Sequence, residues 1–338
     1  MARVIVLLSG GVDSSVSALL LKRAGFDVVG VHLRMTSLNN CSFQDWLDAK
    51  SVAQQLEIPF YTIDIEDEYR KLIMEKTIKD YERGITPNPD VLCNSEIKFG
   101  YVFEKLLRNS DDFIATGHYA KNIDGLIRLP KDLQKDQTYF LWKIKKEILP
   151  RVIFPLGDLL KNEVRKIAKE NNLIVADKKD SQGLCFVGKI KFRDFLKSFL
   201  PPKEGPVYDT YGNLIGKHYG HFYYTLGQRH GFLAPQGPWY VANKDPEKNV
   251  LVVAKEGDEA LTKKEIFYEE ENYFIELKES QDVLVKIRYR NEFLPAKIYP
   301  REKRVILKKK AKVPTPGQSI VFYKDSILVG GGIIKEAL

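Results

Sequence analysis

The chain has 338 residues, of which 44% are hydrophobic and 29% are charged, as is typical of a globular protein with two or three domains. Its apolar runs are far shorter than the ~20 residues that cross a bilayer, which excludes a membrane-spanning helix. Three widely spaced cysteines without a CxxC pair argue against a disulfide scaffold or a closed zinc site and favour a cytoplasmic protein. The formal net charge of +8 favours a polyanionic partner.

The first 120 residues alternate short apolar or β-branched runs with helical patterns. The predicted strands are residues 4–8, 28–33, 60–65 and 113–116. The predicted helices are residues 14–24, 43–56 and 66–81, followed by a helix that contains Phe99, Phe103, Leu106 and Leu107. This alternation predicts an α/β domain with a Rossmann-like parallel sheet, helices on both faces, and a site at the carboxyl ends of the strands.

A helix predicted from Phe192, Phe195, Leu196 and Phe199 is followed, from Val207 onward, by an all-β pattern. Turn signals such as Thr315-Pro316-Gly317 separate short alternating runs there. We therefore predict a catalytic domain over 1–200, a small central β-rich domain over 201–260 and a β-barrel over 261–338. Between Lys286 and Lys312 eleven Lys or Arg face two Glu, which suits a nucleic-acid backbone but also a solvated charged surface.

The segment Ser9-Gly10-Gly11-Val12-Asp13-Ser14 lies between the first predicted strand and the first predicted helix. Glycines at a helix N-terminus expose backbone N–H groups and the positive end of the helix dipole, which favours an anion. The segment has neither the Walker lysine nor a GxGxxG pattern. Because Asp13 would repel phosphate unless a cation lay between them, we expect a Mg²⁺-pyrophosphate ligand. The alternative is an ordinary capped helix with an acid in its first turn.

This segment resembles the PP-loop of the ATP pyrophosphatases, which cleave ATP to AMP and pyrophosphate while they adenylate a carbonyl oxygen. Further strings occur along the chain in the same order as in one family of these enzymes. They are "TPNPDVLCN", "ATGHYA", "KDQTYFLW", "DSQGLCF", "YTLGQRHG", "KIRYR" and "TPGQSIVFY". With them the chain resembles the tRNA-specific 2-thiouridylases, which replace the C2 oxygen of the wobble uridine, U34, with sulfur.

The resemblance implies a role for each matching residue. ATP would be held by Leu7, Leu8, Ser9, Gly10, Gly11, Val12, Asp13, Ser14, Leu33 and Gly117. The target base or other parts of the tRNA would be contacted by Asn88, Pro89, Asp90, His118, Lys135, Asp136, Gln137, Arg288, Tyr289 and Gln318. Cys93 would be the catalytic nucleophile, and Cys185 would carry a persulfide supplied by a cysteine desulfurase or a sulfur-relay protein.

The contexts of the three cysteines differ. Cys93 and Cys185 are predicted in polar loops, and a thiol near a helix N-terminus favours the thiolate form. Cys41 has no such context and is interpreted as a spectator. A labile iron–sulfur cluster on Asp90, Cys93 and Cys185 is an alternative sulfur source, although a carboxylate is an unusual cluster ligand.

Two other functions remain open at this point. One is a different PP-loop enzyme, which would form 4-thiouridine or an amide. The other is a non-catalytic module that binds nucleotide or RNA without turnover. The presence of Asp13, Cys93 and Cys185 argues against the second.

Overall fold

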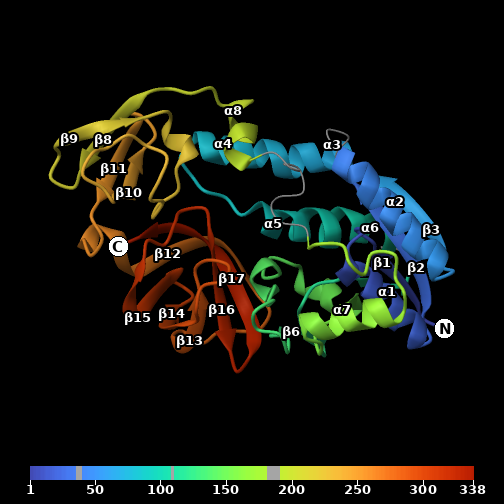
Figure 1. Ribbon diagram of the computed structural model, residues 1–338. Coiled ribbons are helices and arrows are strands. Elements are labelled where there is room, and N and C mark those ends of the chain that lie inside the picture. Colours follow the sequence, from blue (N-terminus) through green and yellow to red (C-terminus); the bar gives the residue numbers. More distant parts are fainter. Residues whose placement is uncertain (36–39, 108–109, 181–190) are drawn as a thin grey trace. The chain divides into compact units, whose positions relative to one another are not determined.

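The computed structural model describes residues 1–35, 40–107, 110–180 and 191–338, and it contains two compact units (Figure 1). Unit 1 comprises Met1–Met74, Asp90–Lys189 and Asp325–Leu328. Unit 2 comprises Glu75–Pro89, Ile190–Lys324 and Val329–Leu338. A segment from the first third of the chain, residues 75–89, therefore groups with the C-terminal half. The boundaries 1–200, 201–260 and 261–338 stay a prediction.

Unit 1 is built on a five-stranded sheet with the order β3-β2-β1-β4-β7, in which every neighbouring pair is parallel. Its strands are β1 (Arg3–Leu7), β2 (Asp27–Arg34), β3 (Phe60–Asp64), β4 (Phe113–Ala115) and β7 (Val152–Ile153). The first four match the predicted strands to within one residue at each end, which confirms the Rossmann-like parallel sheet. The carboxyl ends of β1 and β4 are neighbours, since Val6 pairs with Ala115.

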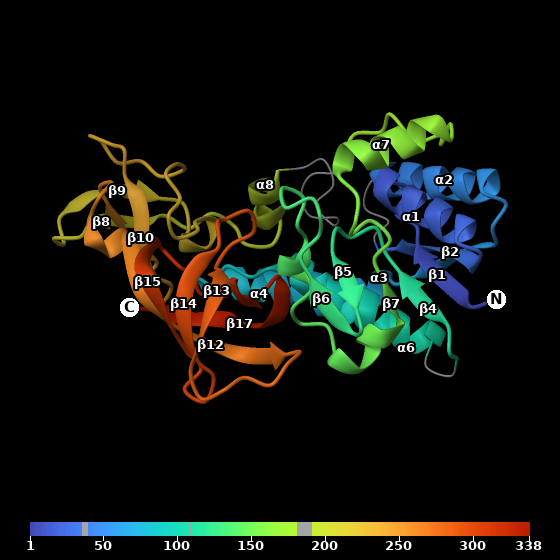
Figure 2. The ribbon, with the colours of Figure 1, turned by 90° about the horizontal axis from the view of Figure 1, so that it is seen from below.

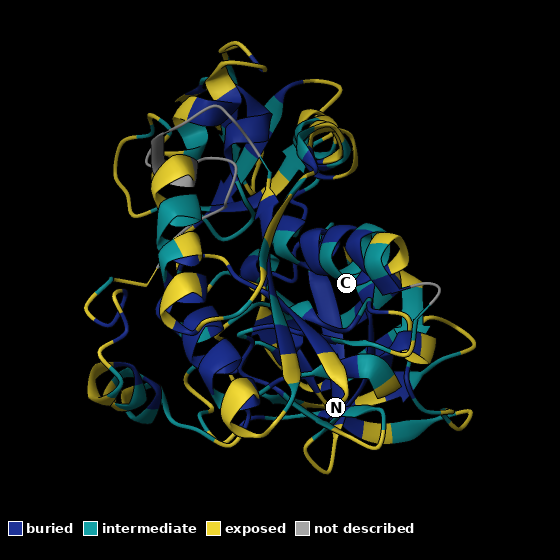
Figure 3. Ribbon diagram, turned by 90° about the vertical axis from the view of Figure 1, so that its right-hand side faces the viewer, coloured by how far each residue is buried: buried dark blue, intermediate teal, exposed yellow. Residues whose placement is uncertain are grey.

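Helices cover both faces of this sheet. They are α1 (Val12–Arg23), α2 (Asn40–Gln55), α3 (Glu66–Tyr69), α6 (Val102–Leu107) and α7 (Lys161–Glu170). Because right-handed crossovers run from β1 through β2 to β3, α1 and α2 lie on one face, together with α7, while α6 lies on the other (Figure 2). The apolar faces of α1, α2 and α7 pack with the sheet into one buried core, and Figure 3 shows buried and exposed positions alternating along the helices.

Several elements of unit 1 are absent from the sequence prediction. They are α7 itself, the hairpin β5 (Lys121–Ile123) and β6 (Leu126–Arg128), and the 3-10 turns η3 (Thr138–Phe140) and η4 (Lys146–Arg151). The predicted helix 66–81 is interrupted by the π-helical η1 (Arg70–Glu75) and resumes as α4 (Lys76–Glu82). Within the described residues, no helix is both long and apolar enough to cross a membrane.

Unit 2 holds a small sheet and a barrel, as the all-β pattern predicts. The small sheet has the order β10-β11-β8-β9. Its strands are β8 (Gly205–Asp209), β9 (Leu214–His218), β10 (Tyr240–Asp245) and β11 (Val250–Ala254), and the nearby helical elements are α8 (Phe192–Lys197), η5 (His221–Tyr223) and η6 (Glu259–Leu261).

The barrel closes because β12 pairs with β17 as well as with β15. Its strands are β12 (Thr262–Tyr273), β13 (Gln281–Lys286), β14 (Leu294–Tyr299), β15 (Arg304–Lys312), β16 (Ser319–Lys324) and β17 (Ile327–Ala337). The inward-facing residues of these strands alternate with polar ones and form a second buried core. A C-terminal β-barrel is therefore confirmed.

Candidate active site

The loop between β1 and α1 is the centre of the candidate site. Its Gly10 has φ +76°, and a Cβ there would overlap the backbone carbonyl oxygen of Asp45 on α2. The Ser14 hydroxyl closes the loop, because it accepts a hydrogen bond from the Ser9 amide at 3.2 Å and lies 3.1 Å from the Ser9 hydroxyl. The first four N–H groups of a helix have no partner within it. The glycine loop therefore presents the amides of the first turn of α1 to an anion.

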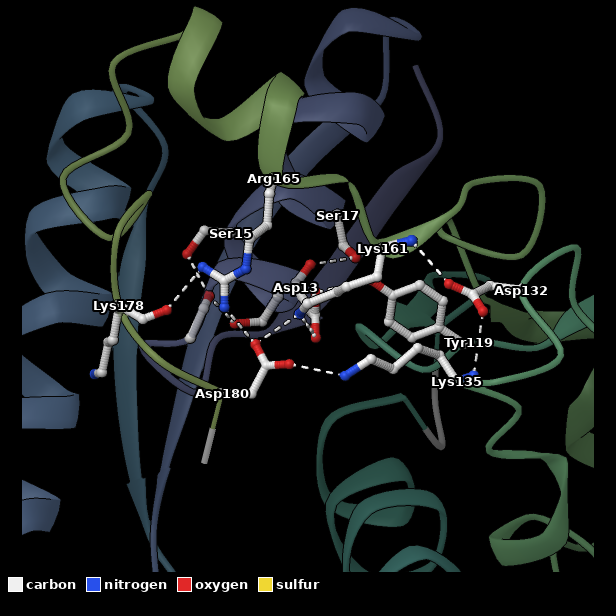
Figure 4. A network of polar contacts seen from close by, with 12 residues as sticks. Asp13, Ser15, Ser17, Tyr119, Asp132, Lys135, Lys161, Arg165, Lys178 and Asp180 are labelled. Atoms are coloured by element: carbon white, nitrogen blue, oxygen red, sulfur yellow. Dashed lines mark hydrogen bonds and ion pairs between the residues drawn. The ribbon is translucent and has the colours of Figure 1, made fainter. Parts of the chain in front are cut away.

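Two side chains hold the Asp13 carboxylate from outside α1. The Lys161 ammonium, at the start of α7, donates to both carboxylate oxygens at 2.7 and 2.8 Å. The Tyr119 hydroxyl donates to the same carboxylate at 3.0 Å, and burial followed by the charge of Asp13 raises the pKa of that hydroxyl. Figure 4 shows Lys161 and Tyr119 converging on Asp13. The acid of the PP-loop is thus neutralised by a cation that lies 148 residues further along the chain.

Asp180 is the second acid of this network. Its carboxylate lies 2.8 Å from Lys161, 3.0 Å from Lys135 and 2.6 Å from Arg165. Burial alone would raise the pKa of Asp180, but the hydrogen bonds from Lys161 and Lys135 lower it to about 2. Asp180 thus shares Lys161 with Asp13 and has Lys135 and Arg165 as further partners (Figure 4). These three cations suit a polyanionic ligand that replaces the carboxylates as their partner.

Lys178 ties the segment after α7 to the other side of the loop. Its ammonium donates to the Gly10 carbonyl at 2.9 Å, to Asp45 at 2.7 Å and to Asp48. Burial opposes the charge of Lys178, but these two carboxylates raise its pKa. Residues 178–180 are thus held at two places: Lys178 binds the Gly10 carbonyl and α2, and Asp180 binds Lys161, the partner of Asp13.

Gly117, after β4, packs against the first turn of α1. A Cβ at this position would lie 2.8 Å from the Ser14 amide nitrogen and 2.9 Å from the Asp13 carbonyl carbon. Real Cβ atoms do not approach backbone so closely. The absence of a side chain at Gly117 therefore lets the ends of β1 and β4 meet.

Replacement of Gly117 by alanine is expected to displace the first turn of α1. Because backbone atoms must move, we expect a loss of roughly 1–3 kcal/mol in the free energy of unfolding and an ATP affinity at least about tenfold weaker. Denaturant titration and equilibrium nucleotide binding measure the two effects. A variant that binds ATP like the wild type would show that this contact does not shape the nucleotide site.

His118 lies next to Gly117 and is only 9% exposed. Its Nδ1 lies 2.7 Å from the Thr116 hydroxyl, and its ring packs against Phe99 and Phe154. Burial, followed by the positive charge of Lys98, lowers the pKa of His118 well below 6.5. The imidazole is therefore neutral in the folded protein at neutral pH.

A neutral buried His118 makes the fold sensitive to acid. Below about pH 6.5 the imidazole of His118 takes up a proton in the unfolded chain but not in the folded chain. The free energy of unfolding is therefore highest above that pH and decreases as the pH falls. We expect the thermal midpoint of His118→Asn to fall less than that of the wild type between about pH 7.5 and pH 5. His32 and His218, whose pKa values are also lowered by burial, remain in both proteins. Parallel loss in the two proteins would contradict this assignment.

Cys93 lies in a continuous helical stretch and not in a polar loop, which corrects the sequence interpretation. The stretch begins with α5 (Pro89–Leu92) and continues as the π-helical η2 (Cys93–Tyr101) and α6. Cys93 is 6% exposed, so packing in a helix and not a mobile loop sets its position. Its place near the helix N-terminus is as predicted. π-helical turns occur often at functional sites.

Residues that follow Cys93 connect its helix to the loop after β4 within unit 1, since Phe99 packs against His118. Asn94 donates to the Phe140 carbonyl at 3.1 Å, and Lys98 donates to Asn94 at 3.0 Å. The charge of Lys98 acts on both Asp90 and His118. Burial raises the pKa of Asp90, and Lys98 opposes this rise. The helix of Cys93 thus lies beside the loop after β4, whose Gly117 touches Asp13.

The segment Lys135-Asp136-Gln137 holds two residues of the site, Tyr119 and Asp180. The Gln137 side chain accepts from the Tyr119 amide at 2.9 Å, and the 3% exposed Asp136 accepts from the Thr138 amide and hydroxyl at 2.9 and 2.6 Å. Lys135 is partly exposed and binds Asp180. The contact of these residues with tRNA stays a prediction.

Unit 2 contains Asn88, Pro89, Arg288, Tyr289 and Gln318. The Arg288 guanidinium donates to the Leu226 carbonyl and the Thr315 hydroxyl, both at 2.7 Å. Gln318 donates to the carbonyls of Thr86 and Pro87. These side chains therefore hold other parts of unit 2, which their sequence motifs do not reveal.

Three further predicted positions complete the picture. Leu33 is a buried residue near the carboxyl end of β2, where we expect the adenine. Cys185 lies outside the described residues. Cys41 belongs to the first turn of α2, and its interpretation as a spectator stays a prediction.

Sequence reasoning missed Tyr119, Lys161, Arg165, Lys178 and Asp180 as site residues. Lys161 and Arg165 are four positions apart and share a face of α7, but no single residue of "KNEVRKIAK" distinguishes this face from any solvated helix. Tyr119 lies within "ATGHYA", so its position in the loop that follows β4 is the signal that the sequence offers.

Comparison with known proteins accounts for nearly the whole chain. The family described as "tRNA methyl transferase HUP domain" matches residues 2–189, "tRNA methyl transferase PRC-barrel domain" matches 193–255, and "Aminomethyltransferase beta-barrel domain" matches 244–334. The chain is 41% identical over 354 residues to "tRNA-specific 2-thiouridylase MnmA" of Francisella philomiragia, covering 98% of this chain and 99% of the relative. It is 42% identical, with the same coverage, to the protein of that name in Francisella tularensis subsp. novicida.

Solved structures are less similar. A 4-thiouridine synthetase in complex with RNA and ATP is 18% identical, covers 59% of this chain and 50% of its own, and has a TM-score of 0.36. A similarity of this size carries no argument about function.

Proposed function

The chain belongs to the tRNA-specific 2-thiouridylases, and from this membership we propose that it replaces the C2 oxygen of the wobble uridine, U34, of tRNA with sulfur at the expense of ATP. 2-Thiolation of tRNA is the activity of the family. The position in the tRNA, the residues and the chemical steps are our proposal. The observation that carries it is the network in which Lys161, Lys135 and Arg165 surround the two acids beside the PP-loop.

ATP binds with its phosphates at the N-terminus of α1. Residues 7–14 supply backbone amides and serine hydroxyls, Gly117 leaves room for the close approach of two loops, and buried Leu33 lies under the adenine. Lys161 leaves Asp13 for the phosphates, because an ammonium gains more from a polyphosphate than from a single carboxylate. Arg165 and Lys135 act from the same side.

A magnesium ion fits this site as a companion of the nucleotide. Mg²⁺ is usually bound by one or two carboxylates together with substrate phosphates, and Asp13 and Asp180 offer two carboxylates beside the expected phosphates. Among the described residues, no group of three or more His, Cys, Asp or Glu is arranged to hold a metal ion. Mg²⁺ would neutralise charge on the departing pyrophosphate.

Activation precedes sulfur transfer because a uridine C2 oxygen is a poor leaving group. The oxygen attacks the α-phosphorus of ATP and pyrophosphate departs, which converts the oxygen into part of AMP. On one route the terminal sulfur of a persulfide on Cys185 attacks C2 and displaces AMP, and the Cys93 thiolate then attacks the Cys185 sulfur, which breaks the S–S bond and leaves the terminal sulfur on C2. On the other route Cys93 first attacks the Cys185 sulfur of the persulfide, and the sulfide that is released attacks C2 and displaces AMP. Either route leaves a Cys93–Cys185 disulfide, which a reductant must reopen. A disulfide needs Cα atoms within about 4.4–6.8 Å.

Closeness in sequence to Asp180 supports a role for Cys185 near the nucleotide. Asp180 is held by Lys161, Lys135 and Arg165, and Cys185 follows five residues later in the sequence.

The partners follow from the chemistry. The persulfide requires a cysteine desulfurase or a relay protein as donor, and the basic residues between Lys286 and Lys312 suit the tRNA backbone.

Release of pyrophosphate tests the proposal against simple nucleotide binding. We expect AMP and pyrophosphate to form from ATP only when a tRNA with U34 is present. Equal release without tRNA, or none with it, would contradict adenylation of the tRNA.

A further inference from the structure

The turn Thr315-Pro316-Gly317-Gln318 precedes β16 in unit 2. The Gln318 amide donates to the Thr315 carbonyl at 3.0 Å, which closes the turn. Proline in its second position and glycine with φ +89° in its third define a type II turn. Thr315 is 1% exposed, and its hydroxyl accepts a hydrogen bond from Arg288 at 2.7 Å. The turn is therefore firmly anchored on the barrel.

This turn holds the backbone of a segment more than 200 residues earlier in the chain. The Thr86 amide donates to the Pro316 carbonyl at 3.1 Å, and the Gln318 side-chain NH₂ donates to the carbonyls of Thr86 and Pro87, both at 3.0 Å. Both acceptors are carbonyls, so only the NH₂ group of Gln318 can make these bonds. Three hydrogen bonds thus fix residues 86 and 87 on the barrel.

Gly317 brings the turn against this segment. A methyl group at Gly317 would overlap the Ile85 side chain and lie 2.9 Å from the Thr86 carbonyl oxygen. Glycine is needed here for close approach as well as for its positive φ.

The segment leads directly to Asn88 and Pro89. In the run Thr86-Pro87-Asn88-Pro89 each proline fixes its own φ and restricts the residue before it. A position imposed on Thr86 and Pro87 is therefore passed on to Asn88 and Pro89, which belong to the same unit as the barrel.

We propose that Gln318 is a positioning residue, which holds the Thr86–Pro87 segment so that Asn88 and Pro89 meet the target base. This inference rests on the proposed role of Asn88 and Pro89 at the base. It adds to the tRNA contact that family resemblance assigns to Gln318.

Gln318→Ala tests the positioning role. Misplacement of the segment that leads to Asn88 and Pro89 lowers the rate of the bound complex, so we expect kcat of thiolation at saturating tRNA to fall about 10–100-fold. A variant that loses only a tRNA contact would bind tRNA more weakly and keep its kcat at saturation. An unchanged kcat would overturn the proposal.

A pair of glycine variants provides a matched control. Gly317 and Gly257 both have φ +89°, but a Cβ at Gly257 would have no atom within 4 Å of it, whereas a Cβ at Gly317 would meet Ile85 and Thr86. Gly317→Ala should lower kcat like Gln318→Ala, and Gly257→Ala should carry the same backbone strain without that loss. Equal kcat values in the two glycine variants would overturn the role of the contact.

Hydrogen exchange tests the contact without any activity. The Thr86 amide should exchange at least about tenfold faster in Gln318→Ala than in the wild type, and at the wild-type rate in Gly257→Ala. Unchanged exchange at Thr86 in Gln318→Ala would overturn the proposal even if kcat falls. A wild-type protein that protects Thr86 but does not thiolate tRNA would overturn the proposed function instead.

Discussion

Replacement of Cys93 by serine is expected to abolish 2-thiolation, with a rate at least about 10³-fold below that of the wild type. A serine hydroxyl cannot attack a persulfide or form the disulfide that ends the reaction. Cys93 is buried at the start of η2, and serine fits the same volume, so the variant should fold and bind ATP as before. Thiolation is measured as 2-thiouridine in digested tRNA, and ATP binding by equilibrium titration.

The other two cysteines provide the comparison. Cys185→Ser should abolish thiolation to the same extent, and Cys41→Ser should retain it. An active Cys185→Ser enzyme would rule out the persulfide on Cys185, and an active Cys93→Ser enzyme would remove the nucleophile from the mechanism.

Changes at Asp13 and Lys161 should lower kcat/KM for Mg·ATP by at least about 10²-fold each. The two changes should alter the affinity for metal-free pyrophosphate in opposite directions. Asp13→Asn removes the acid that holds the Lys161 ammonium at 2.7 and 2.8 Å, so metal-free pyrophosphate should bind more tightly. Lys161→Met removes the cation itself, so pyrophosphate should bind more weakly. Calorimetric titration in the presence of a chelator measures both.

Lys166 is the matched control for Lys161. It lies on the same helix, 74% exposed, and pairs only with Glu170 among the ion pairs of the described chain. Lys166→Met should bind pyrophosphate like the wild type. If both lysine variants bound pyrophosphate equally weakly, the loss of positive charge alone would explain the effect, and a specific role of Lys161 would be contradicted. Weaker binding of metal-free pyrophosphate to Asp13→Asn would contradict the exchange of Lys161 between the acid and the phosphate.

Local patterns allowed much of unit 1 to be predicted. The run Val4–Leu8 is apolar and β-branched and is followed by two glycines, so β1 and the loop after it were evident from the sequence. The turn Thr315-Pro316-Gly317 was evident for the same reason, since proline and glycine at adjacent positions fix a backbone shape without tertiary contacts.

Long-range contacts account for what the sequence did not show. Lys161 binds Asp13 across 148 positions, and Gln318 binds Thr86 across 232. No local pattern encodes such partners. Cys93 was placed in a loop because prolines and polar residues surround it, whereas tertiary packing extends a helical stretch from Pro89 to Leu107. Burial of Cys93 depends on that packing and on no feature of the nearby sequence.

Analysis of the nucleosides of treated tRNA by mass spectrometry tests the central claim most directly. The wild-type protein is incubated with tRNA, Mg·ATP and a persulfide source, and the tRNA is then digested and its anticodon fragment sequenced. We predict that one uridine, at the wobble position, exchanges its C2 oxygen for sulfur, and only when ATP and persulfide are both present. The account would be contradicted if the wobble uridine stayed unmodified although the protein is folded and binds ATP, or if sulfur were found at C4 instead of C2.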